Sequence, residues 1–489
     1  MKNEYTLSRA RHYERTALAA PMCRPAFHFS PPVGWCNDPN GFSRFAGEYH
    51  LFFQYHPYDT TWGLMHWGHT TTTDFLHWSA KPCALAPDTA ADARGCFSGG
   101  AIEWKGKHLL LYTGVSGVSG AECQQQCLAI GDGIDYVKAV ENPVIPAGHQ
   151  PDGSSTVDFR DPYLFVRDGQ LYALIGGRGP NGHGRLLLYR ADESGCVWRF
   201  VQILAENDGS RGSMWECPSI FTLEDREILL CSPQFMRSTA DGRYHGGNGV
   251  MALIGRWGGP GTPFRCEEDT PLDYGLDFYA PQIVTAPDGR VILIAWMQNW
   301  DHCYPGDDAA WYGQLSLPRE LFWQEARLCQ RPVAELTAAR RKTAEHRAVS
   351  LTAEPTFLAG VRGRILDVEL DVTPAPDCRR FGVRVACGEE QYADLRFDFS
   401  DRLLRLDRRF AGGVRDAAEL REVPLCTPLH AGHWRLRMVL DRFSAEFFVE
   451  DGAQVLSMTL YVPPLSNDGI CFFSTGDCRL NVAAYTLSV

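Results

Sequence analysis

Long apolar stretches are missing from this sequence of 489 residues. No apolar run approaches the roughly 18–20 residues that a membrane-spanning helix needs. The first residues also scatter Arg9, Arg11, Glu14 and Arg15 where a secretory signal peptide would place an apolar block. We therefore expect a soluble, unexported protein with a cytoplasmic location.

Basic residues are in deficit as well. The chain has 47 Lys and Arg against 59 Asp and Glu, so its formal net charge is −12. A negative mean field repels polyanions, which argues against nucleic acid or an anionic membrane surface as a partner. The 45% hydrophobic content is ample for packed cores, and the length corresponds to several domains of roughly 100–200 residues each.

Several familiar signatures are also absent. The 17 cysteines include no C-x-x-C pair, and the sequence has neither a G-x-S-x-G nucleophile elbow nor a phosphate-binding P-loop. An odd number of cysteines in a long chain without an export signal is typical of reduced, mostly buried thiols. We therefore interpret the cysteines as small hydrophobic residues.

What the sequence does contain is one phrase that recurs five times. A polar turn precedes an apolar, β-prone run, at successive offsets of 59, 63, 56 and 64 residues. Gly and Asp suit the turn, and Ile, Leu, Val and Tyr suit a pleated sheet, so each phrase predicts a hairpin turn entering a buried strand. The phrases begin at Gly47, Gly106, Gly169, Asp225 and Gly289.

A spacing near 60 residues leaves room for four short strands and long loops in each unit, which is the size of a large β-propeller blade. We therefore predict a five-bladed β-propeller over residues 24–324. The alternative is a chance recurrence of hairpins in an ordinary all-β protein.

The sequence changes in character after Trp323. Residues 325–350 have helical tendency and little strand character, so we predict a linker there. Residues 351–489 return to short β-prone runs with partial period-two alternation, which is typical of an antiparallel sandwich. The predicted fold class is therefore all-β, a five-bladed β-propeller followed by a C-terminal β-sandwich. We expect the sandwich to pack against the propeller and, as a further role, to mediate a homodimer.

Carboxylates recur at matching positions before the repeated phrases. The first strand of a propeller blade lines the central axis, so residues eight to ten positions before each phrase should meet at one mouth of the channel. Three carboxylates held together are costly unless chemistry uses them. The residues found at these positions are Asp38, Phe97 with Ser98, Asp161, Glu216 and Tyr279.

Each carboxylate also has a local interpretation. Asp38 lies among turn formers and could cap an Asx-turn, and Asp161 lies in an Arg-Asp-Pro turn that could hold a local ion pair. Glu216 is harder to explain locally, because a charged residue in an apolar strand that ends in proline needs a partner. The matching offsets favour a shared site over three independent turns.

Two carboxyl groups that face one glycosidic bond can hydrolyse it. At about 5–5.5 Å apart, one attacks the anomeric carbon while the other protonates the leaving oxygen. A third can stabilise the oxocarbenium-like transition state. The apolar neighbours of Glu216, Trp215 and a Cys-Pro step, are of the kind that raise a carboxyl pKa and suit the acid, whereas Asp38 among amide donors suits an ionised nucleophile.

Histidines offer a competing interpretation. His66, His69 and His77 could suggest a metal site, but their stretch has the pattern of strand and turn and lacks further spaced ligands. We therefore favour structural or sugar-contacting roles for them and predict no metal site.

The motifs around these positions carry a family resemblance, which spans roughly Arg24 to Leu336. They are Trp35-Cys36-Asn37-Asp38-Pro39-Asn40-Gly41, Phe97-Ser98-Gly99, Arg160-Asp161-Pro162, Glu216-Cys217-Pro218, Phe278-Tyr279-Ala280 and Leu317-Pro318-Arg319-Glu320-Leu321. Together they closely resemble glycoside hydrolase family 32, the invertases and sucrose-6-phosphate hydrolases. The later part of the chain matches more loosely, as a family-like C-terminal β-sandwich.

The resemblance implies a retaining β-fructofuranosidase that needs no cofactor and acts on sucrose, sucrose-6-phosphate or short fructo-oligosaccharides. It implies Asp38 as the nucleophile, Glu216 as the acid/base and Asp161 as the transition-state stabiliser. Cys36 departs from the Met or Leu of many members. Further positions resembling the fructose-site motifs are Trp35, Asn37, Gln54, Trp62, Phe97, Ser98, Arg160 and Tyr279, with Trp296 as a less secure addition.

Three alternatives stay open at this point. The enzyme could transfer the fructosyl unit to another sugar, or it could be an inverting five-bladed glycosidase that acts on arabinan. A non-catalytic sugar-binding propeller is the alternative from another class, although the presence of all three carboxylates argues against it. The sequence leaves open whether the substrate carries a phosphate, because one or two well-placed basic residues suffice to bind it.

Overall fold

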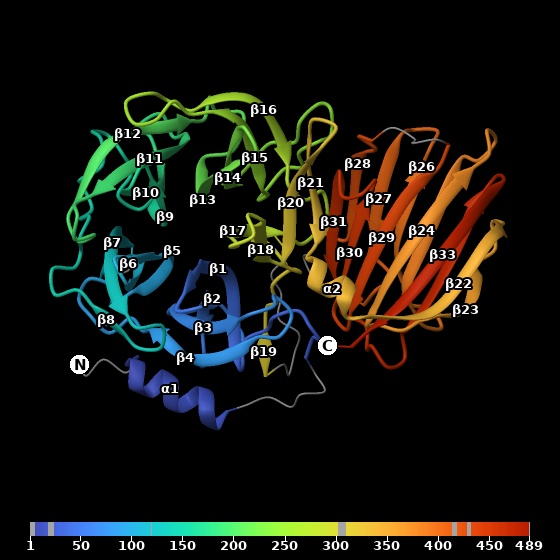
Figure 1. Cartoon of the computed structure of the whole chain (residues 1–489), viewed down its shortest axis with the longest axis horizontal. Helices are drawn as coiled ribbons and strands as arrows, with labels where there is room; N and C mark the ends of the chain where they lie inside the picture. Colours follow the sequence, from blue (N-terminus) through green and yellow to red (C-terminus); the bar gives the residue numbers. More distant parts are fainter. Residues whose placement is uncertain are drawn as a thin grey trace.

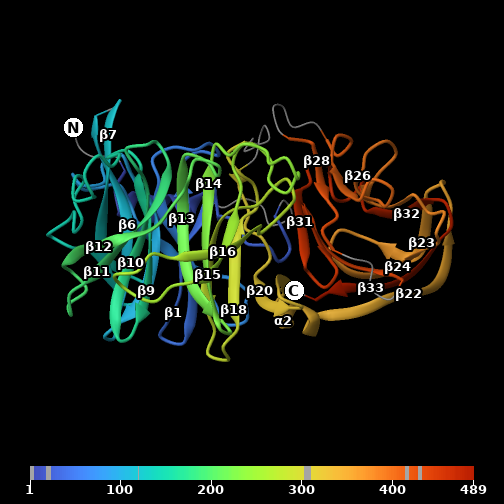
Figure 2. The same cartoon turned by 90° about the horizontal axis from the view of Figure 1, so that it is seen from above.

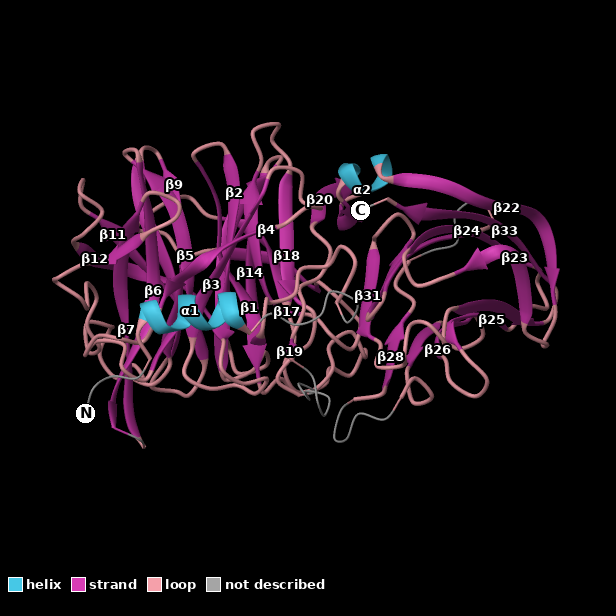
Figure 3. Cartoon of the chain, turned by 90° about the horizontal axis from the view of Figure 1, so that it is seen from below, coloured by secondary structure: helices cyan, strands magenta, loops and turns pink. Residues whose placement is uncertain are grey.

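Almost all of the regular secondary structure in the described residues is β-strand (Figure 3). The computed structural model describes residues 5–17, 24–118, 120–301, 310–412, 418–427 and 432–488. Within these ranges, the two α-helices are α1 (Leu7–Thr16) and α2 (Ala334–Ala338). The all-β class predicted from the sequence is confirmed.

Five small sheets form a ring in the first two thirds of the chain, and the first strand of each sheet stands nearest the centre (Figure 1). The first sheet contains β1 (Gly34–Phe45), β2 (Glu48–His56), β3 (His66–Thr72), β4 (Ser79–Leu85) and β19 (Trp311–Tyr312). The second contains β5 (Gly95–Trp104), β6 (Lys107–Val118), β7 (Ala121–Gly131) and β8 (Tyr136–Lys138). The third contains β9 (Phe159–Arg167), β10 (Gln170–Arg178), β11 (Gly184–Ala191) and β12 (Trp198–Glu206). The fourth contains β13 (Met214–Leu223), β14 (Arg226–Gln234), β15 (Met251–Arg256) and β16 (Arg265–Pro271). The fifth contains β17 (Tyr279–Thr285), β18 (Val291–Trp296), β20 (Arg319–Gln324) and β21 (Arg327–Pro332).

The repeated phrase marks the same turn in every sheet of the ring. Each phrase begins in the turn between the first and second strands, where an antiparallel pair reverses direction. The second strands are almost entirely buried, as their apolar composition predicts. The five hairpins predicted from the sequence are therefore confirmed.

The ring closes through a parallel pairing between distant segments. Strand β19 pairs with β1, with Gly34 opposite Trp311 and Trp35 opposite Tyr312. The indole of Trp35 also stacks on the ring of Tyr312, with 5.0 Å between ring centroids. This contact fixes the start of β1, which carries the first motif.

Two six-stranded sheets follow, packed face to face beside the ring (Figure 2). One contains β22 (Arg340–Leu351), β24 (Leu366–Pro374), β29 (Trp434–Asp441), β30 (Ser444–Val449), β31 (Gln454–Thr459) and β33 (Cys478–Leu487). The other contains β23 (Thr356–Arg362), β25 (Arg380–Cys387), β26 (Ala393–Asp398), β27 (Leu403–Asp407), β28 (Leu420–Pro424) and β32 (Gly469–Thr475). Their inward residues form a separate apolar core that includes Phe381, Phe397 and Phe447.

The secondary structure of residues 325–350 differs from the expected helical linker. The segment holds β21, the short helix α2 and most of β22. Strand β22 pairs with β33 along almost its whole length, and β21 pairs with β20. The hydrogen bonds of these neighbouring strands override the weak helical preference of the Arg- and Ala-rich sequence.

Buried charges join the ring to the paired sheets. His28 lies between Asp441 and Glu446, with Nδ1 2.9 Å from an Asp441 oxygen and Nε2 2.8 Å from a Glu446 oxygen. Burial opposes the charged imidazole, but the two carboxylates outweigh it and raise the pKa of His28 to about 9. Arg319 donates to Glu446 at 2.8 Å and to Asp273 at 2.9 Å. Because all of these groups are buried, losing one partner would leave another charge uncompensated, which fixes how the two parts of the chain dock.

Candidate active site

The site predicted from the sequence lies at the beginnings of the five central strands. Asp38 is on β1, Ser98 on β5, Asp161 on β9, Glu216 on β13 and Tyr279 begins β17. The three carboxylate residues are nearly buried, with 8%, 5% and 9% of their surface exposed in that order. Matching positions in separate sheets therefore supply one buried group each.

A local irregularity accompanies the site in every one of these strands. The regular pairing shifts between the first and second strands of each sheet, which adds a bulge that can turn a side chain towards the axis. The shifts fall between Cys36 and Pro39, Phe97 and Gly99, Leu174 and Gly176, Glu216 and Ser219, and Tyr279 and Gln282. Asp161, Cys217 and Ala280 also have positive φ angles of 64°, 45° and 52°, a strained conformation for residues with a side chain.

Asp38 has one bonded oxygen and one free oxygen. The Ser98 hydroxyl donates to Oδ2 at 2.8 Å, and the Cys217 thiol lies 3.7 Å from the same atom. Oδ1 has no hydrogen-bond partner within the described part of the chain. Burial, together with the charge of Glu216, raises the pKa of Asp38 to about 6. Asp38 is therefore mostly ionised at neutral pH, and one of its oxygens is buried without a hydrogen-bond partner among the described residues.

Asp161 is held by its neighbours on two strands. Its Oδ2 accepts a hydrogen bond of 3.0 Å from the Cys217 backbone and lies 4.0 Å from Nε of Arg160. Its own backbone N–H donates to the Thr113 hydroxyl at 2.9 Å. Burial and the charge of Glu216 raise the pKa of Asp161 to about 7, although the Arg160 guanidinium opposes the shift.

Glu216 lies in a polar environment. Nε of Arg160 donates to one carboxylate oxygen at 2.8 Å, and the Tyr279 hydroxyl donates to the other at 2.6 Å. The apolar surroundings expected from Trp215 and the Cys-Pro step are therefore not what the carboxylate meets. The bulge at Glu216 explains the difference, because it turns the side chain towards the axis of the ring, where it contacts Arg160 of β9 and Tyr279 of β17.

Shared partners bring the three carboxylates together. Cys217 contacts Asp38 through its thiol and Asp161 through its backbone N–H. Arg160 contacts both Asp161 and Glu216 through the same Nε atom. The carboxylates therefore surround one point at the mouth of the ring.

The buried aromatic and amide residues of the prediction form the wall behind Asp38. Nε1 of Trp35 donates to the Asn37 side chain at 2.7 Å, which orients the residue next to Asp38. Trp296 packs edge-on against Trp35, with 6.1 Å between centroids, and is fully buried. Gln54 donates to the backbone carbonyl of Cys96 at 3.1 Å.

Trp62 and Phe97 lie nearer the solvent. Trp62 is 49% exposed, and its indole meets the Phe97 ring edge-on with 5.9 Å between centroids. Phe97 directly precedes Ser98, the hydroxyl donor to Asp38. This pair gives the site an apolar side wall at its entrance, the kind of surface that suits the apolar face of a sugar.

Four supporting residues were not singled out from the sequence. Asn40 accepts a hydrogen bond from Gly99 N, Thr113 accepts from Asp161 N, and Gln124 accepts from Arg160 Nη1. Cys217 is the fourth, through the two contacts given above. Asn40 and Cys217 lie inside recognised motifs and could have been found there, whereas Thr113 and Gln124 lie on β6 and β7 without a local signal.

The described residues contain no group of three or more His, Cys, Asp and Glu side chains arranged to hold a metal ion. His69 instead bonds His50 at 3.0 Å, and His77 bonds Asp74 at 2.6 Å. Neither α1 nor α2 is long and apolar enough to cross a membrane.

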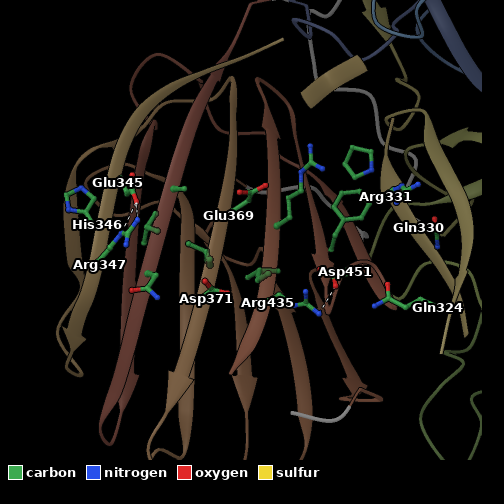
Figure 4. Close-up of a pocket in the computed structure, with 18 of the residues that line it drawn as sticks. Gln324, Gln330, Arg331, Glu345, His346, Arg347, Glu369, Asp371, Arg435 and Asp451 are labelled. Atoms are coloured by element: carbon green, nitrogen blue, oxygen red, sulfur yellow. Dashed lines mark hydrogen bonds and ion pairs between the residues drawn. The ribbon is translucent and has the colours of Figure 1, made fainter. Parts of the chain in front are cut away.

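A polar groove of about 650 Å³ lies away from this site, between β20, β21 and the outer face of the sheet that begins with β22 (Figure 4). Some of its charged side chains pair with one another, Arg435 with Asp451 at 2.6 Å and Arg347 with Glu345 at 2.7 Å. None of the predicted site residues lines it.

Buried carboxylates grouped around one point are typical of a glycoside hydrolase. Here one oxygen of Asp38 has no hydrogen bond among the described residues, and an aromatic wall lies at the entrance. The comparison with known families agrees. Residues 28–332 match the glycosyl hydrolases family 32 N-terminal domain, and residues 335–487 match the glycosyl hydrolases family 32 C-terminal domain. The chain belongs to glycoside hydrolase family 32, so the resemblance noted in the sequence is confirmed.

Characterised relatives are similar over nearly the whole chain. The raffinose invertase of Escherichia coli is 37% identical over 98% of both chains, and a sucrose-6-phosphate hydrolase of Escherichia coli is 35% identical over 92% of both. Among solved structures, the GH32 β-fructofuranosidase of Bombyx mori is 32% identical, with a TM-score of 0.82 over 98% of this chain and 97% of that chain.

Proposed function

We propose that this enzyme hydrolyses terminal β-D-fructofuranosyl bonds of sucrose, sucrose-6-phosphate or short fructo-oligosaccharides, with retention of configuration. Asp38 is the nucleophile, Glu216 the acid/base and Asp161 the stabiliser of the transition state. The observation that carries the proposal is the convergence of these three carboxylates through Cys217 and Arg160.

In the first step, Asp38 attacks the anomeric carbon of the fructosyl unit. Glu216 gives its proton to the leaving oxygen as the glycosidic bond breaks, and a fructosyl ester forms on Asp38. The free Oδ1 of Asp38 supports this role, because an oxygen without a hydrogen bond is available for attack. Asp161 accepts hydrogen bonds from the sugar hydroxyls, and its negative charge favours the oxocarbenium-like transition state.

In the second step, Glu216 takes a proton from water, and the water oxygen attacks the same carbon. The ester bond breaks, Asp38 returns as a carboxylate, and fructose leaves with its original configuration after two inversions. Arg160 and Tyr279 hold Glu216 in place for both proton transfers through one contact to each oxygen. No cofactor enters either step.

The substrate class rests on the relatives. The most similar ones reported above are named for raffinose and for sucrose-6-phosphate, and a solved Bombyx mori variant was complexed with sucrose at 32% identity. These names favour hydrolysis over fructosyl transfer, over an arabinan-cleaving enzyme and over a sugar-binding protein without turnover.

The remaining fold assignments belong to the same proposal. The five sheets of the ring are the blades of a five-bladed β-propeller, and the two six-stranded sheets form the C-terminal β-sandwich. We place the boundary between them near Val333, because β21 still pairs within the fifth sheet of the ring and β22 within the sandwich. A homodimer and a cytoplasmic location stay predictions.

The test replaces Asp38 by Asn and Glu216 by Gln and measures the release of fructose from sucrose. Loss of a nucleophile or an acid/base of this kind lowers kcat by at least roughly 10³-fold. Asp225→Asn is the matched control, because Asp225 lies exposed in a hairpin turn and should leave the rate unchanged. Near-normal turnover in either site variant, or release of the inverted anomer first, contradicts the mechanism.

A further inference from the structure

Helix α1 lies outside the ring, against the edge strand β4 (Figures 1 and 3). Arg11 donates to the backbone carbonyl of Cys83 at 2.9 Å, and Glu14 accepts from the Cys83 N–H at 3.1 Å. The helix side chains therefore satisfy the backbone groups that an edge strand leaves open. Ala10 of the helix is fully buried. Helix α1 is thus docked firmly on the first sheet.

The same helix surrounds one aromatic side chain of the ring. Tyr58 lies in the loop between β2 and β3, and its ring meets Tyr13 with 5.2 Å between centroids. Tyr5, just before the helix, approaches it at 5.8 Å, and the Arg9 guanidinium lies 5.1 Å from its ring centre. The Tyr58 hydroxyl has no hydrogen-bond partner within the described residues, so the ring itself makes the contacts. Such ring contacts stabilise by packing and by cation–π attraction.

Tyr58 in turn packs against His56, which contacts the backbone at the tip of the loop between β2 and β3. The two rings meet edge-on, with 6.0 Å between centroids. Nδ1 of His56 lies 3.0 Å from the carbonyl oxygen of Thr61. A Cβ added to Gly63 would lie only 2.5 Å from the His56 ring, so the backbone on that side is in close contact as well. His56 therefore holds both residues that flank Trp62.

Trp62 completes the connection to the active site. It packs against Phe97, whose neighbour Ser98 donates to Asp38. Trp62 is 49% exposed, so packing on its own side of the loop cannot fix its position alone. The contacts through His56 and Tyr58 supply that support.

We propose that α1 is a positioning element of the active site, which acts through Tyr58 and His56 to hold Trp62 in the orientation that binds the sugar. Tyr58 is the positioning residue, since it makes no contact with the three carboxylates. The inference rests on the proposed function, because it assigns the apolar wall at Trp62 to the sugar. It means that the five-sheet ring without α1 does not hold Trp62 in place.

The test compares Tyr58→Ala with wild type for KM and kcat on sucrose. The Trp62 wall is remote from the bond that breaks and contacts the ground state and the transition state alike, so its misplacement weakens binding more than chemistry. We expect KM to rise roughly threefold to tenfold, the size of a coupling between contacting residues, while kcat changes by less than about twofold. Tyr58→Phe should restore the wild-type KM because the hydroxyl is unpartnered.

Controls separate positioning from stability. His12→Ala changes an exposed residue of the same helix and should leave KM unaltered. In a Trp62→Ala background, Tyr58→Ala should add little to KM, because the residue it positions is already gone. If Tyr58→Ala does not fold, Tyr13→Leu, which removes one ring contact, replaces it in the same cycle.

Two outcomes overturn the inference. The first is a lower melting temperature with an unchanged KM, which would make α1 a structural brace only. The second is a KM effect that adds in full to that of Trp62→Ala. Failure of the proposed function is distinguished from both, because then wild type itself would release no fructose from sucrose.

Discussion

The Tyr279 hydroxyl offers the sharpest test of the site geometry. It donates to Oε2 of Glu216 at 2.6 Å, and the whole side chain is buried. Tyr279→Phe removes this one donor and keeps the ring that fills the space. A hydrogen bond to a charged group contributes about 1.5–3 kcal/mol, so we expect kcat/KM to fall by roughly 10-fold to 150-fold.

Initial rates of sucrose hydrolysis measure the effect, with thermal unfolding recorded beside them. Tyr112→Phe is the matched control, because its hydroxyl also donates to a buried carboxylate, Asp92, at 2.7 Å, but not to a site residue. The control should lose stability and keep its kcat/KM. If Tyr279→Phe retains kcat/KM within about twofold, the hydrogen bond does not position the acid/base and the reasoning from this geometry is wrong.

Two further predictions concern pH. Because burial and the charge of Glu216 raise the pKa of Asp38 to about 6 and that of Asp161 to about 7, kcat/KM should fall as the pH drops below about 7, and by at least about tenfold per pH unit below 6, where the nucleophile is protonated. Ser98→Ala removes a donor to the ionised form and should move this acid limb to higher pH; a limb that stays in place contradicts the assignment. Burial also lowers the pKa values of His66 and His108 to about 3, below the ordinary 6.5, so between these values the unfolded chain binds more protons than the folded one. The free energy of unfolding should therefore decrease as the pH is lowered, by about 1.4 kcal/mol per pH unit for each histidine. Urea unfolding of His108→Gln between pH 6 and 4 should show a correspondingly shallower decline than that of wild type.

The ring of sheets could be predicted because its signal is local and repeated. A hairpin turn and the buried strand that follows it occupy about ten consecutive residues, and the phrase at Gly106 or Gly169 contains everything that the turn needs. Counting back from these turns located one side chain of the candidate site on each central strand. The regular repeat of the hairpins thus showed which residues far apart in the sequence lie close together in space.

Residues 340–351 show where this reasoning fails. Strand β22 exists because β33, more than a hundred residues later, supplies its hydrogen-bond partner. No feature within the segment itself records that partner, and its composition favours a helix. Helix α1 was missed for a related reason, since its side chains are recognisable as partners of an edge strand only once β4 is in place.

Within the candidate site, the convergence of the three carboxylates was predictable but the environment of Glu216 was not. Its sequence neighbours are apolar, yet its actual partners, Arg160 and Tyr279, come from other sheets. The bulge between Glu216 and Ser219 turns the side chain towards them, and a bulge has no one-residue signature in the sequence.

The charge balance of the candidate site explains why the pKa values of two of its carboxylates lie near neutral pH. Of the three carboxylates, Asp161 and Glu216 contact one buried guanidinium, that of Arg160, so the mutual repulsion of the three is only partly compensated. Burial and this repulsion raise the pKa values of Asp38 and Asp161 to about 6 and about 7. The protonation of Asp38 and Asp161 therefore changes with pH just below and around neutrality, where the proposed nucleophile and stabiliser must be ionised. Since the groups come from separate strands of the ring, the fold holds together charges that would otherwise move apart.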